Sequence, residues 1–243
     1  MVPTILITRP DPSGAAFADQ VRRRFGDTVQ IVLSPVLKIE RCGSLPDLSR
    51  FRTLIFTSRH GVEAFAALSD RRDLPAYAVG DATARSARDA GMSVVACGGD
   101  APSLVARILA DEVQGPCLHI HGEHAAGNIS GDLTLAGIET HEAILYRQAA
   151  VDLNDMAKAA LQRGTPVIVP LFSPRSARLF CQGLKARAPL WAVAISENAR
   201  AEIPAGLVRD VVIAGHPSAP AMLDAMQGPI DAAKRLEGGN AAK

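Results

Sequence analysis

The chain is poor in aromatic residues and carries almost no net charge. Phe, Trp and Tyr make up 4% of its 243 residues, and the formal net charge is +1. Proteins that bind single-stranded nucleic acid stack bases on aromatic side chains, and strongly basic fields attract nucleic acid and membrane surfaces. The composition therefore favours a protein with no nucleic-acid or membrane partner.

Cysteine is also scarce, and long apolar runs are missing. The four cysteines, Cys42, Cys97, Cys117 and Cys181, form no C-x-x-C pair and no disulfide-like spacing. Residues 1–12 lack the features of a signal peptide, and no apolar run approaches the ~18 residues of a membrane span. We expect a reducing, cytoplasmic setting. We also expect a monomer, because no extended apolar stripe is left over.

Several common functional motifs are missing. The chain contains no G-x-x-x-x-G-K-[ST], no G-x-G-x-x-G after an apolar run and no G-x-S-x-G. These absences argue against a P-loop enzyme, a dinucleotide-binding domain and a serine hydrolase with a nucleophile elbow.

What the sequence does contain is an alternation of short apolar runs and helical patterns. "TILIT" at 4–8 precedes a stretch at 13–26 in which Phe17, Val21 and Phe25 share one helical face. Similar pairs follow, from "TLIFT" at 53–57 to "DVVIAG" at 210–215. Strands that alternate with helices predict βαβ crossovers and an α/β fold with mostly parallel sheets.

This pattern occurs twice. Phe56 matches Phe172 at an offset of 116 (172 − 56), and Gly26 matches Gly137 at an offset of 111 (137 − 26). The chain reads as a, b, a′, b′, with two strands in a and three in b, which predicts two five-stranded doubly wound domains. Unit a can pair with b, or with b′ through two neighbouring extended linkers near 35–40 and 144–150. Residues from about 228 are expected to form a flexible tail.

Small polar residues stand where most predicted strands pass into helices. Ligands of open parallel sheets bind outside the carboxyl ends of the strands, and helix N termini favour anions. Ser58, Ser103 and Ser173 therefore fit either an anion site or a simple helix cap. Two domains with these edges turned inward would form an anion-binding cleft.

The segment "CLHIHGEH" at 117–124 partly resembles a metal site. His119 and His121 share one face of a predicted strand, with Cys117 and His124 nearby. No acidic partner is evident in the sequence, so we expect no metal. Tyr146, in "LYRQ", fits either a weak acid or a residue packed against a domain edge.

Seven segments together resemble the uroporphyrinogen-III synthase family over residues 4–227. They are "ITRP", "IFTSRHGVEAF", "AVGDATA", "HGE", "LYRQ", "FSPRSARLF" and "AISENA". The resemblance implies the second pairing of units, as two flavodoxin-like domains joined by a two-segment extended linker. Domain 1 would hold residues 1–36 and 149–227, domain 2 residues 39–146, and residues 228–243 would be the tail.

The resemblance also implies a reaction in the cleft between the domains. Hydroxymethylbilane, a linear tetrapyrrole with eight carboxylates, would become uroporphyrinogen III by loss of water, inversion of the last pyrrole ring and ring closure. No cofactor or metal would take part. The alternative is a two-domain protein that binds a polycarboxylate or tetrapyrrole-like anion without chemistry, and a sugar-nucleotide transferase fits less well because phosphate and metal motifs are missing.

Matched motif by motif, the resemblance assigns Tyr146 as the catalytic proton donor. The substrate-binding residues implied in the same way are Arg9, Thr57, Ser58, Gly80, Thr83, Gly122, Ser173 and Ser196. The sequence departs from the family pattern at His121, where many members have arginine. It departs again at Ser196 and Asn198, which replace the usual Gly and Thr.

Overall fold

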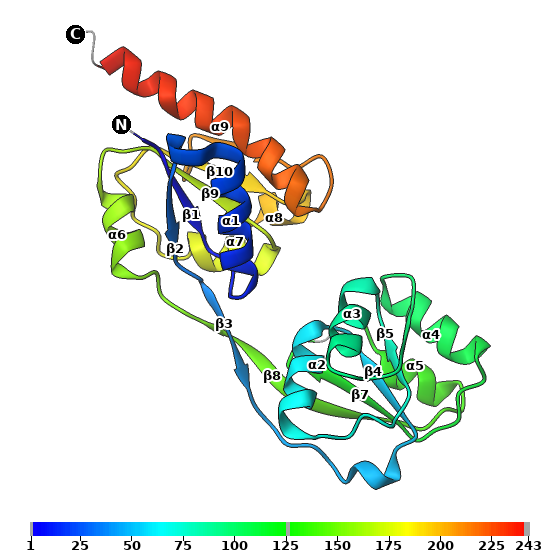
Figure 1. Ribbon diagram of the computed structural model, residues 1–243. Coiled ribbons are helices and arrows are strands. Elements are labelled where there is room, and N and C mark those ends of the chain that lie inside the picture. The colour runs from blue at the N-terminus through cyan, green and yellow to red at the C-terminus, as the bar shows by residue number, and fades with distance from the viewer. Residues whose placement is uncertain (1, 125–126, 241–243) are drawn as a thin grey trace. The chain divides into compact units, whose positions relative to one another are not determined.

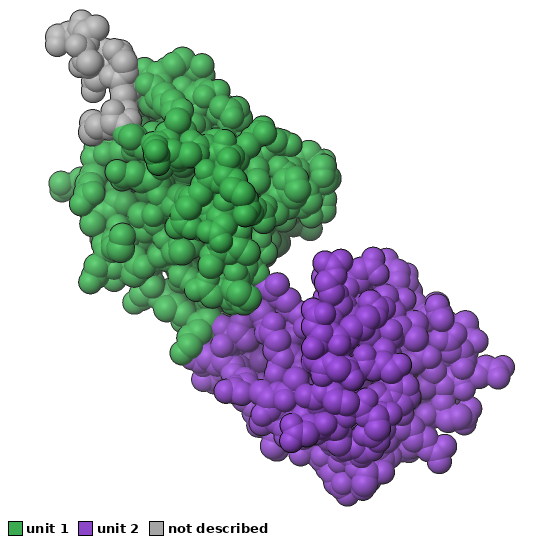
Figure 2. All heavy atoms as spheres, viewed as in Figure 1, with its two compact units in different colours: residues 1–38, 150–243 green, residues 39–149 purple. Residues whose placement is uncertain are grey.

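The computed structural model describes residues 2–124 and 127–240, which fall into two compact units (Figure 1). Unit 1 comprises Met1–Lys38 and Ala150–Lys243, and unit 2 comprises Ile39–Ala149 (Figure 2). Both have the expected α/β character, with mostly parallel sheets. In the described residues, no helix combines the length and apolar character needed to cross a membrane.

Unit 1 is built on a five-stranded sheet of order β11-β10-β9-β1-β2, in which the neighbouring strands pair in parallel. The strands are β1 (Thr4–Ile7), β2 (Gln30–Leu33), β9 (Val167–Leu171), β10 (Leu190–Ala194) and β11 (Asp210–Ile213). The helices are α1 (Ser13–Phe25), α6 (Asp155–Gln162), α7 (Pro174–Cys181), α8 (Glu197–Ala201) and α9 (Ala219–Asn240), with a 3₁₀ turn, η1 (Gly26–Thr28). Counted in chain order within the unit, the strand order is 2-1-3-4-5, that of a flavodoxin-like sheet.

Alternating side chains of the strands divide this unit into three layers. Ile5 and Ile7 pack with Phe17 of α1 and Met222 of α9 on one face of the sheet. Leu6 belongs to the cluster on the opposite face, where α6 and α7 pack. Because successive strand residues point to opposite faces, apolar residues at nearly every position of β1 require helices on both sides.

The C-terminal segment differs from the flexible tail expected after residue 228. Helix α9 continues through Pro229 to Asn240, and Ile230 and Ala233 are buried in the core of unit 1. Ile230 and Ala233 lie four and seven positions after Met226, so they extend the same buried helical face. Gly228 and Pro229 therefore lie inside the helix.

Unit 2 contains a six-stranded sheet of order β3-β8-β7-β4-β5-β6. The strands are β3 (Leu37–Arg41), β4 (Thr53–Phe56), β5 (Ala76–Ala78), β6 (Val94–Ala96), β7 (Cys117–Gly122) and β8 (Thr140–Ala150). The helices are α2 (Arg59–Leu68), α3 (Asp81–Asp89), α4 (Ala101–Ala110) and α5 (Ile129–Leu135), with a 3₁₀ turn, η2 (Leu48–Arg50). Strands β3 and β8 each cross the boundary between the units.

The sheet of unit 2 has one strand more than the five expected. Strand β3 lies beside β8 at the edge, and its neighbour Cys42 donates its N–H to the carbonyl of Leu145. Without β3, the order β8-β7-β4-β5-β6 repeats that of unit 1, with β7 and β8 in the places of β1 and β2. The two sheets are therefore related by a circular permutation, which corresponds to the pairing of a with b′ and of b with a′.

Two further clusters form the core of unit 2. Leu54 and Phe56 of β4 pack with Phe65 of α2 on one face, whereas Ile55 packs with Leu104 of α4 on the other. Helices α2 and α3 thus cover one face of the sheet, and α4 and α5 cover the other.

Candidate functional site

The strand order gives each sheet a topological switch point, the position at which ligands bind in open α/β sheets. In unit 2 this point lies between β4 and β7, and in unit 1 it lies between β1 and β9. The residues that follow these strands are Thr57 and Ser58 after β4, Arg9 after β1 and Ser173 after β9. The predicted site residues therefore concentrate at the carboxyl edges of the two sheets.

Ser58 and Tyr146 form a direct hydrogen bond at the switch point of unit 2. Their hydroxyl oxygens are 2.8 Å apart, although the residues are 88 positions apart in sequence. Ser58 is also the N-cap of α2, because its Oγ accepts the N–H groups of His60 and Gly61. Ser58 retains its own proton to donate to Tyr146, and in that arrangement the phenolic proton of Tyr146 is available to a ligand.

Gly122 makes room for the Tyr146 ring. A Cβ atom at Gly122 would lie 2.5 Å from Cε2 and 2.6 Å from Cζ of Tyr146. The two residues are partners across β7 and β8, after a shift in the strand register between His121 and Gly122. The backbone carbonyl of Tyr146 accepts the N–H of Glu123. Tyr146 is thus held by backbone pairing as well as by Ser58.

His60 packs its ring edge-on against Tyr146. The ring centroids are 5.7 Å apart, and His60 Nδ1 lies 3.1 Å from a carboxylate oxygen of Glu63. Both residues belong to the first two turns of α2. This contact fixes a second side of the tyrosine ring, and the motif "TSRHGVEAF" contains both His60 and Glu63.

Behind Thr57 lies a buried histidine pair. The Oγ1 of Thr57 is 3.4 Å from Nε2 of His119, whose Nδ1 is 3.2 Å from Oγ of Ser130 on α5. The rings of His119 and His121 are 4.5 Å apart. Burial, with the neighbouring His121 as a smaller cause, lowers the pKa of His119 to about 3, so this ring is neutral at physiological pH.

Gly80 and Thr83 lie at the start of α3, beside the switch point. Gly80 is the N-cap of the helix, and a Cβ atom there would lie 3.2 Å from Cα of Gly99. Gly80 therefore permits close approach of the 97–100 loop, and Thr83 is a buried residue of the first helical turn. The structure brings Thr57, Ser58, Gly122 and Tyr146 together. Gly80 and Thr83 lie where the neighbouring strand β5 passes into α3.

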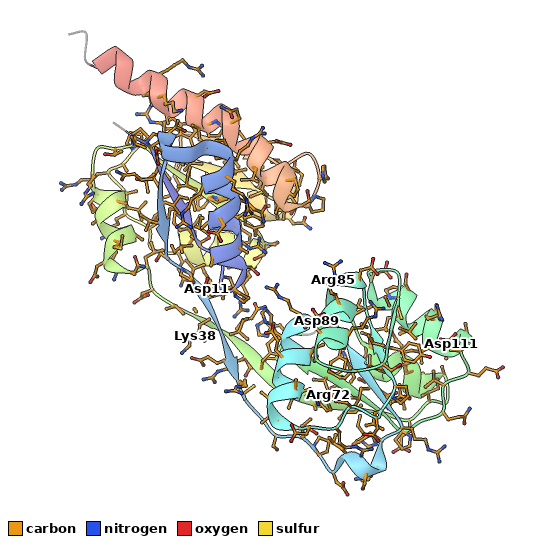
Figure 3. All side chains as sticks on the ribbon, in the orientation of Figure 1. Asp11, Lys38, Arg72, Arg85, Asp89 and Asp111 are labelled. Carbon is orange, nitrogen blue, oxygen red and sulfur yellow. The ribbon has the colours of Figure 1, made fainter. Side chains whose placement is uncertain are left out.

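In unit 1, Arg9 is held over an aromatic ring. Its guanidinium carbon lies 4.0 Å from the ring centroid of Phe172, and Phe172 meets Phe17 edge-on at 4.8 Å. Asp11, labelled in Figure 3, accepts the N–H of Ala15 and closes the turn into α1. The cation–π contact keeps Arg9 at the end of β1, next to the start of α7.

Ser173 and Ser196 are N-caps of α7 and α8. The Oγ of Ser173 accepts the N–H of Ser176 at 3.0 Å, and the Oγ of Ser196 accepts that of Ala199 at 3.3 Å. Their positions match those of Ser58 and Gly80 in unit 2. The capping interpretation of Ser58 and Ser173 is confirmed, but that of Ser103 is wrong. Asp100 caps α4 and accepts the N–H of Ser103 at 2.8 Å.

Tyr77, the other tyrosine, has a different environment. Its hydroxyl donates to Asp111, which also accepts from Arg107. Asp111 follows the C-terminal end of α4 and is labelled in Figure 3. Burial and this hydrogen bond raise the pKa of Tyr77 to about 12. Helix α4 begins at the carboxyl edge of the sheet and ends at the opposite edge, so the Tyr77 hydroxyl lies away from the switch point.

Sequence reasoning missed two contacts of this site. The Ser58–Tyr146 bond joins β4 to β8, and only the strand order β8-β7-β4 brings these residues close. The acidic neighbour of the histidine pair is Glu142, which pairs with His119 across β7 and β8. Cys117 and His124 do not join the pair: Cys117 lies in the core, and His124 is exposed.

Comparison with known proteins gives consistent results for family and fold. The family model described as "Uroporphyrinogen-III synthase HemD" matches residues 16–224. The uroporphyrinogen-III synthetase of Helicobacter pylori is 17% identical, with 94% of this chain and 99% of that chain covered and a TM-score of 0.62. A mutant uroporphyrinogen III synthase of Thermus thermophilus is 14% identical, with 97% and 100% covered and a TM-score of 0.49. The comparison with curated proteins found no match.

Proposed function

Because the chain belongs to the uroporphyrinogen-III synthase family, we propose that it converts hydroxymethylbilane to uroporphyrinogen III. The reaction releases water, inverts the last pyrrole ring and closes the macrocycle. The observation that carries the residue assignment is the 2.8 Å hydrogen bond between Ser58 and Tyr146 at the switch point of unit 2. It supports a phenol held by its neighbours with its proton available to the substrate.

The substrate carboxylates bind at helix N termini in this proposal. Helix N termini present backbone N–H groups and the positive end of the helix dipole, so they bind anions without requiring a large net charge. Helices α2, α3 and α7 begin beside the predicted contacts Ser58, Gly80 and Ser173. A chain with a net charge of only +1 is compatible with a ligand of eight carboxylates on this basis.

Arg9 supplies a fixed positive charge in unit 1. Its contact with Phe172 leaves the planar guanidinium in a defined orientation. Arginine can bind a carboxylate through two parallel hydrogen bonds, which fixes both position and orientation. We assign Arg9 to a substrate carboxylate, and Thr57, Thr83, Gly122 and Ser196 to the surrounding contact surface.

Tyr146 acts as the general acid. The C–O bond of the hydroxymethyl group breaks as the Tyr146 hydroxyl transfers its proton to the departing oxygen, which leaves as water. Ser58 donates a hydrogen bond to the developing tyrosinate. Tyr146 regains a proton when the closed ring loses one from a pyrrole carbon. The remaining catalytic task is positioning, because the substrate must be held so that the inverted closure outruns direct closure.

An isomer assay tests this function. Purified protein is incubated with hydroxymethylbilane, and the oxidised products are separated chromatographically. We expect the type III isomer to dominate, whereas direct closure without the enzyme gives type I. If only type I product forms and a polycarboxylate binds tightly, the chain is instead a binding protein without catalytic activity. The departures from the family pattern at His121, Ser196 and Asn198 are the reason for keeping this alternative.

The notion of a substrate enclosed between the two units stays a prediction. We also propose that the chain acts as a monomer and that it works in the cytoplasm. The four free cysteines support the second of these two proposals, because the cytoplasm keeps thiols reduced. Light scattering coupled to size-exclusion chromatography tests the oligomeric state.

A further inference from the structure

Three potential metal ligands converge on one face of the unit 2 sheet. His119 and His121 lie two positions apart on β7, so their side chains share one face of the sheet. Glu142 pairs with His119 from the neighbouring strand β8. One ligand atom from each of the three lies within 4.8 Å of the others. The proposed reaction uses none of these three side chains, so the cluster needs its own explanation.

His121 presents a buried nitrogen that lacks a hydrogen bond. Its Nδ1 donates to the backbone carbonyl of Gly122 at 2.7 Å, so Nε2 is the ring nitrogen that can coordinate an ion. His121 is 5% exposed, and its Nε2 has no hydrogen-bond partner among the residues that the structure describes. Glu142 Oε1 lies 3.7 Å from this nitrogen, within ion-pair range yet beyond a hydrogen bond. A buried imidazole nitrogen without a hydrogen bond lowers the stability of the fold unless a ligand binds it.

The surroundings prepare both rings for coordination. A histidine coordinates a metal through a ring nitrogen that carries no proton, and both rings are buried, with His119 1% and His121 5% exposed. Thr57 and Ser130 flank the two ring nitrogens of His119, so one hydroxyl can accept a hydrogen bond while the other nitrogen coordinates. Metal-bound histidines commonly donate the N–H of the ring nitrogen that does not coordinate to a carbonyl or hydroxyl in this way.

We propose that His119, His121 and Glu142 bind a divalent transition-metal ion such as Zn²⁺, with water in the remaining position. Two imidazoles and one carboxylate suit zinc, cobalt and nickel better than magnesium or calcium. Bonds of about 2.0–2.2 Å at tetrahedral angles separate two ligand atoms by about 3.4 Å. The 3.7 Å between His121 Nε2 and Glu142 Oε1 is close to that value. The Glu142 side chain is 49% exposed and gives the ion a route from solvent.

Titration of the full-length, chelator-treated protein with Zn²⁺ tests the proposal, with Co²⁺ as a spectroscopic probe. We expect one ion per chain and a cobalt spectrum typical of four-coordinate nitrogen and oxygen ligation. Glu142→Gln keeps the side-chain shape and should weaken binding at least about 10-fold, since even outer ligand contacts contribute that much. His121→Gln should abolish the site.

Glu139→Gln is the matched control. Glu139 directly precedes β8 and pairs with His141 at 2.7 Å, an exposed His–Glu pair that lacks a second buried histidine. This variant should bind Zn²⁺ as the wild type does. Zn²⁺ should raise the thermal midpoint of wild type and Glu139→Gln, but not that of Glu142→Gln, because ligands stabilise only the state that binds them.

Two results would overturn the metal site. One is the absence of stoichiometric Zn²⁺ binding to the wild type. The other is an unchanged Zn²⁺ affinity in Glu142→Gln, which would mean that other residues bind the ion. If His121→Gln does not fold, the exposed Glu142 variant still decides the question. The result is independent of catalysis, because metal binding and isomer formation are measured separately.

Discussion

The Tyr146 hydroxyl is the single group on which the proposed chemistry most depends. Tyr146→Phe removes the proton donor but keeps the ring between Gly122 and His60. We expect turnover to fall by about 10²-fold, at the lower end of general-acid contributions. Stopped assays of type III isomer at saturating substrate measure the change.

Tyr77→Phe is the control for this substitution. Tyr77 is also a buried, hydrogen-bonded phenol, but its partner is Asp111 at the end of α4. Its removal should leave turnover unchanged apart from a small loss of stability. Equal turnover in Tyr146→Phe and wild type would remove Tyr146 from the catalytic role.

Gly122 illustrates a contact that depends on the absence of a side chain. Gly122→Ala places Cβ within 2.6 Å of two Tyr146 ring atoms, so the ring or the β7–β8 pairing must shift. We expect a loss of about 1–3 kcal/mol in the free energy of unfolding, as in other overpacked sites. Turnover should fall on the order of 10²-fold, because a displacement of ~1 Å can have that effect.

Urea unfolding and the isomer assay measure these two effects of Gly122→Ala. Gly164→Ala is the control, since a Cβ atom there meets nothing within 4 Å. Full activity and unchanged stability of Gly122→Ala would contradict the packing described between Gly122 and Tyr146.

Single residues also show where sequence reasoning reaches its limit. Ser58 and Ser173 could be located from the sequence because a serine between an apolar run and a helical pattern is a local signal. The Ser58–Tyr146 bond could not, because it joins strands that are distant in sequence. The Glu142–His121 pair could not either, because it depends on the register between β7 and β8. Ser103 was misassigned because Asp100, three positions earlier, competes for the same capping role.

At the scale of elements, helix α9 shows how burial outweighs local propensity. Gly228 and Pro229 disfavour a helix interior, yet α9 continues because Ile230 and Ala233 complete a buried face. Glycine inside the helix still lowers stability. Gly228→Ala should therefore raise the free energy of unfolding by up to about 1 kcal/mol, because no atom lies within 4 Å of the new Cβ.

The same glycine-to-alanine substitution at Gly206 should lower the free energy of unfolding instead of raising it. Gly206 is equally open but has a φ angle of +80°, which an L-residue adopts only with strain. Gly206→Ala should destabilise by about 1 kcal/mol. Urea denaturation of both variants tests the pair, and a destabilised Gly228→Ala would mean that α9 is not helical at residue 228.

At the scale of the whole molecule, the internal repeat was the most informative feature of the sequence. The offsets of 116 and 111 between matching residues predicted equivalent sheets, and both have the 2-1-3-4-5 order once the permutation is allowed. The sixth strand of unit 2 had no such signal. The segment Leu37–Arg41 has no counterpart in the repeat, and only its pairing beside β8 makes it a strand.

Each hydrophobic cluster consists of residues from one unit, so the two units should unfold in separate transitions. Phe17 lies in a unit 1 cluster and Phe65 in a unit 2 cluster, and both are fully buried. Truncation of either to alanine should destabilise its own unit by about 3–5 kcal/mol. The chain offers natural probes, because its one tryptophan, Trp191, lies in unit 1 and its two tyrosines, Tyr77 and Tyr146, lie in unit 2.

In urea titrations, Phe17→Ala should lower the midpoint reported by Trp191 fluorescence and leave the tyrosine absorbance transition in place. Phe65→Ala should do the reverse. If both substitutions shift both signals equally, the molecule unfolds as one cooperative body, and stability changes in either unit would then propagate to the switch points of both sheets. Separate shifts would instead mean that Gly122→Ala, in unit 2, leaves the edge of unit 1 with Arg9 and Ser173 intact, so that its effect on turnover reports on the unit 2 edge around Gly122 and Tyr146.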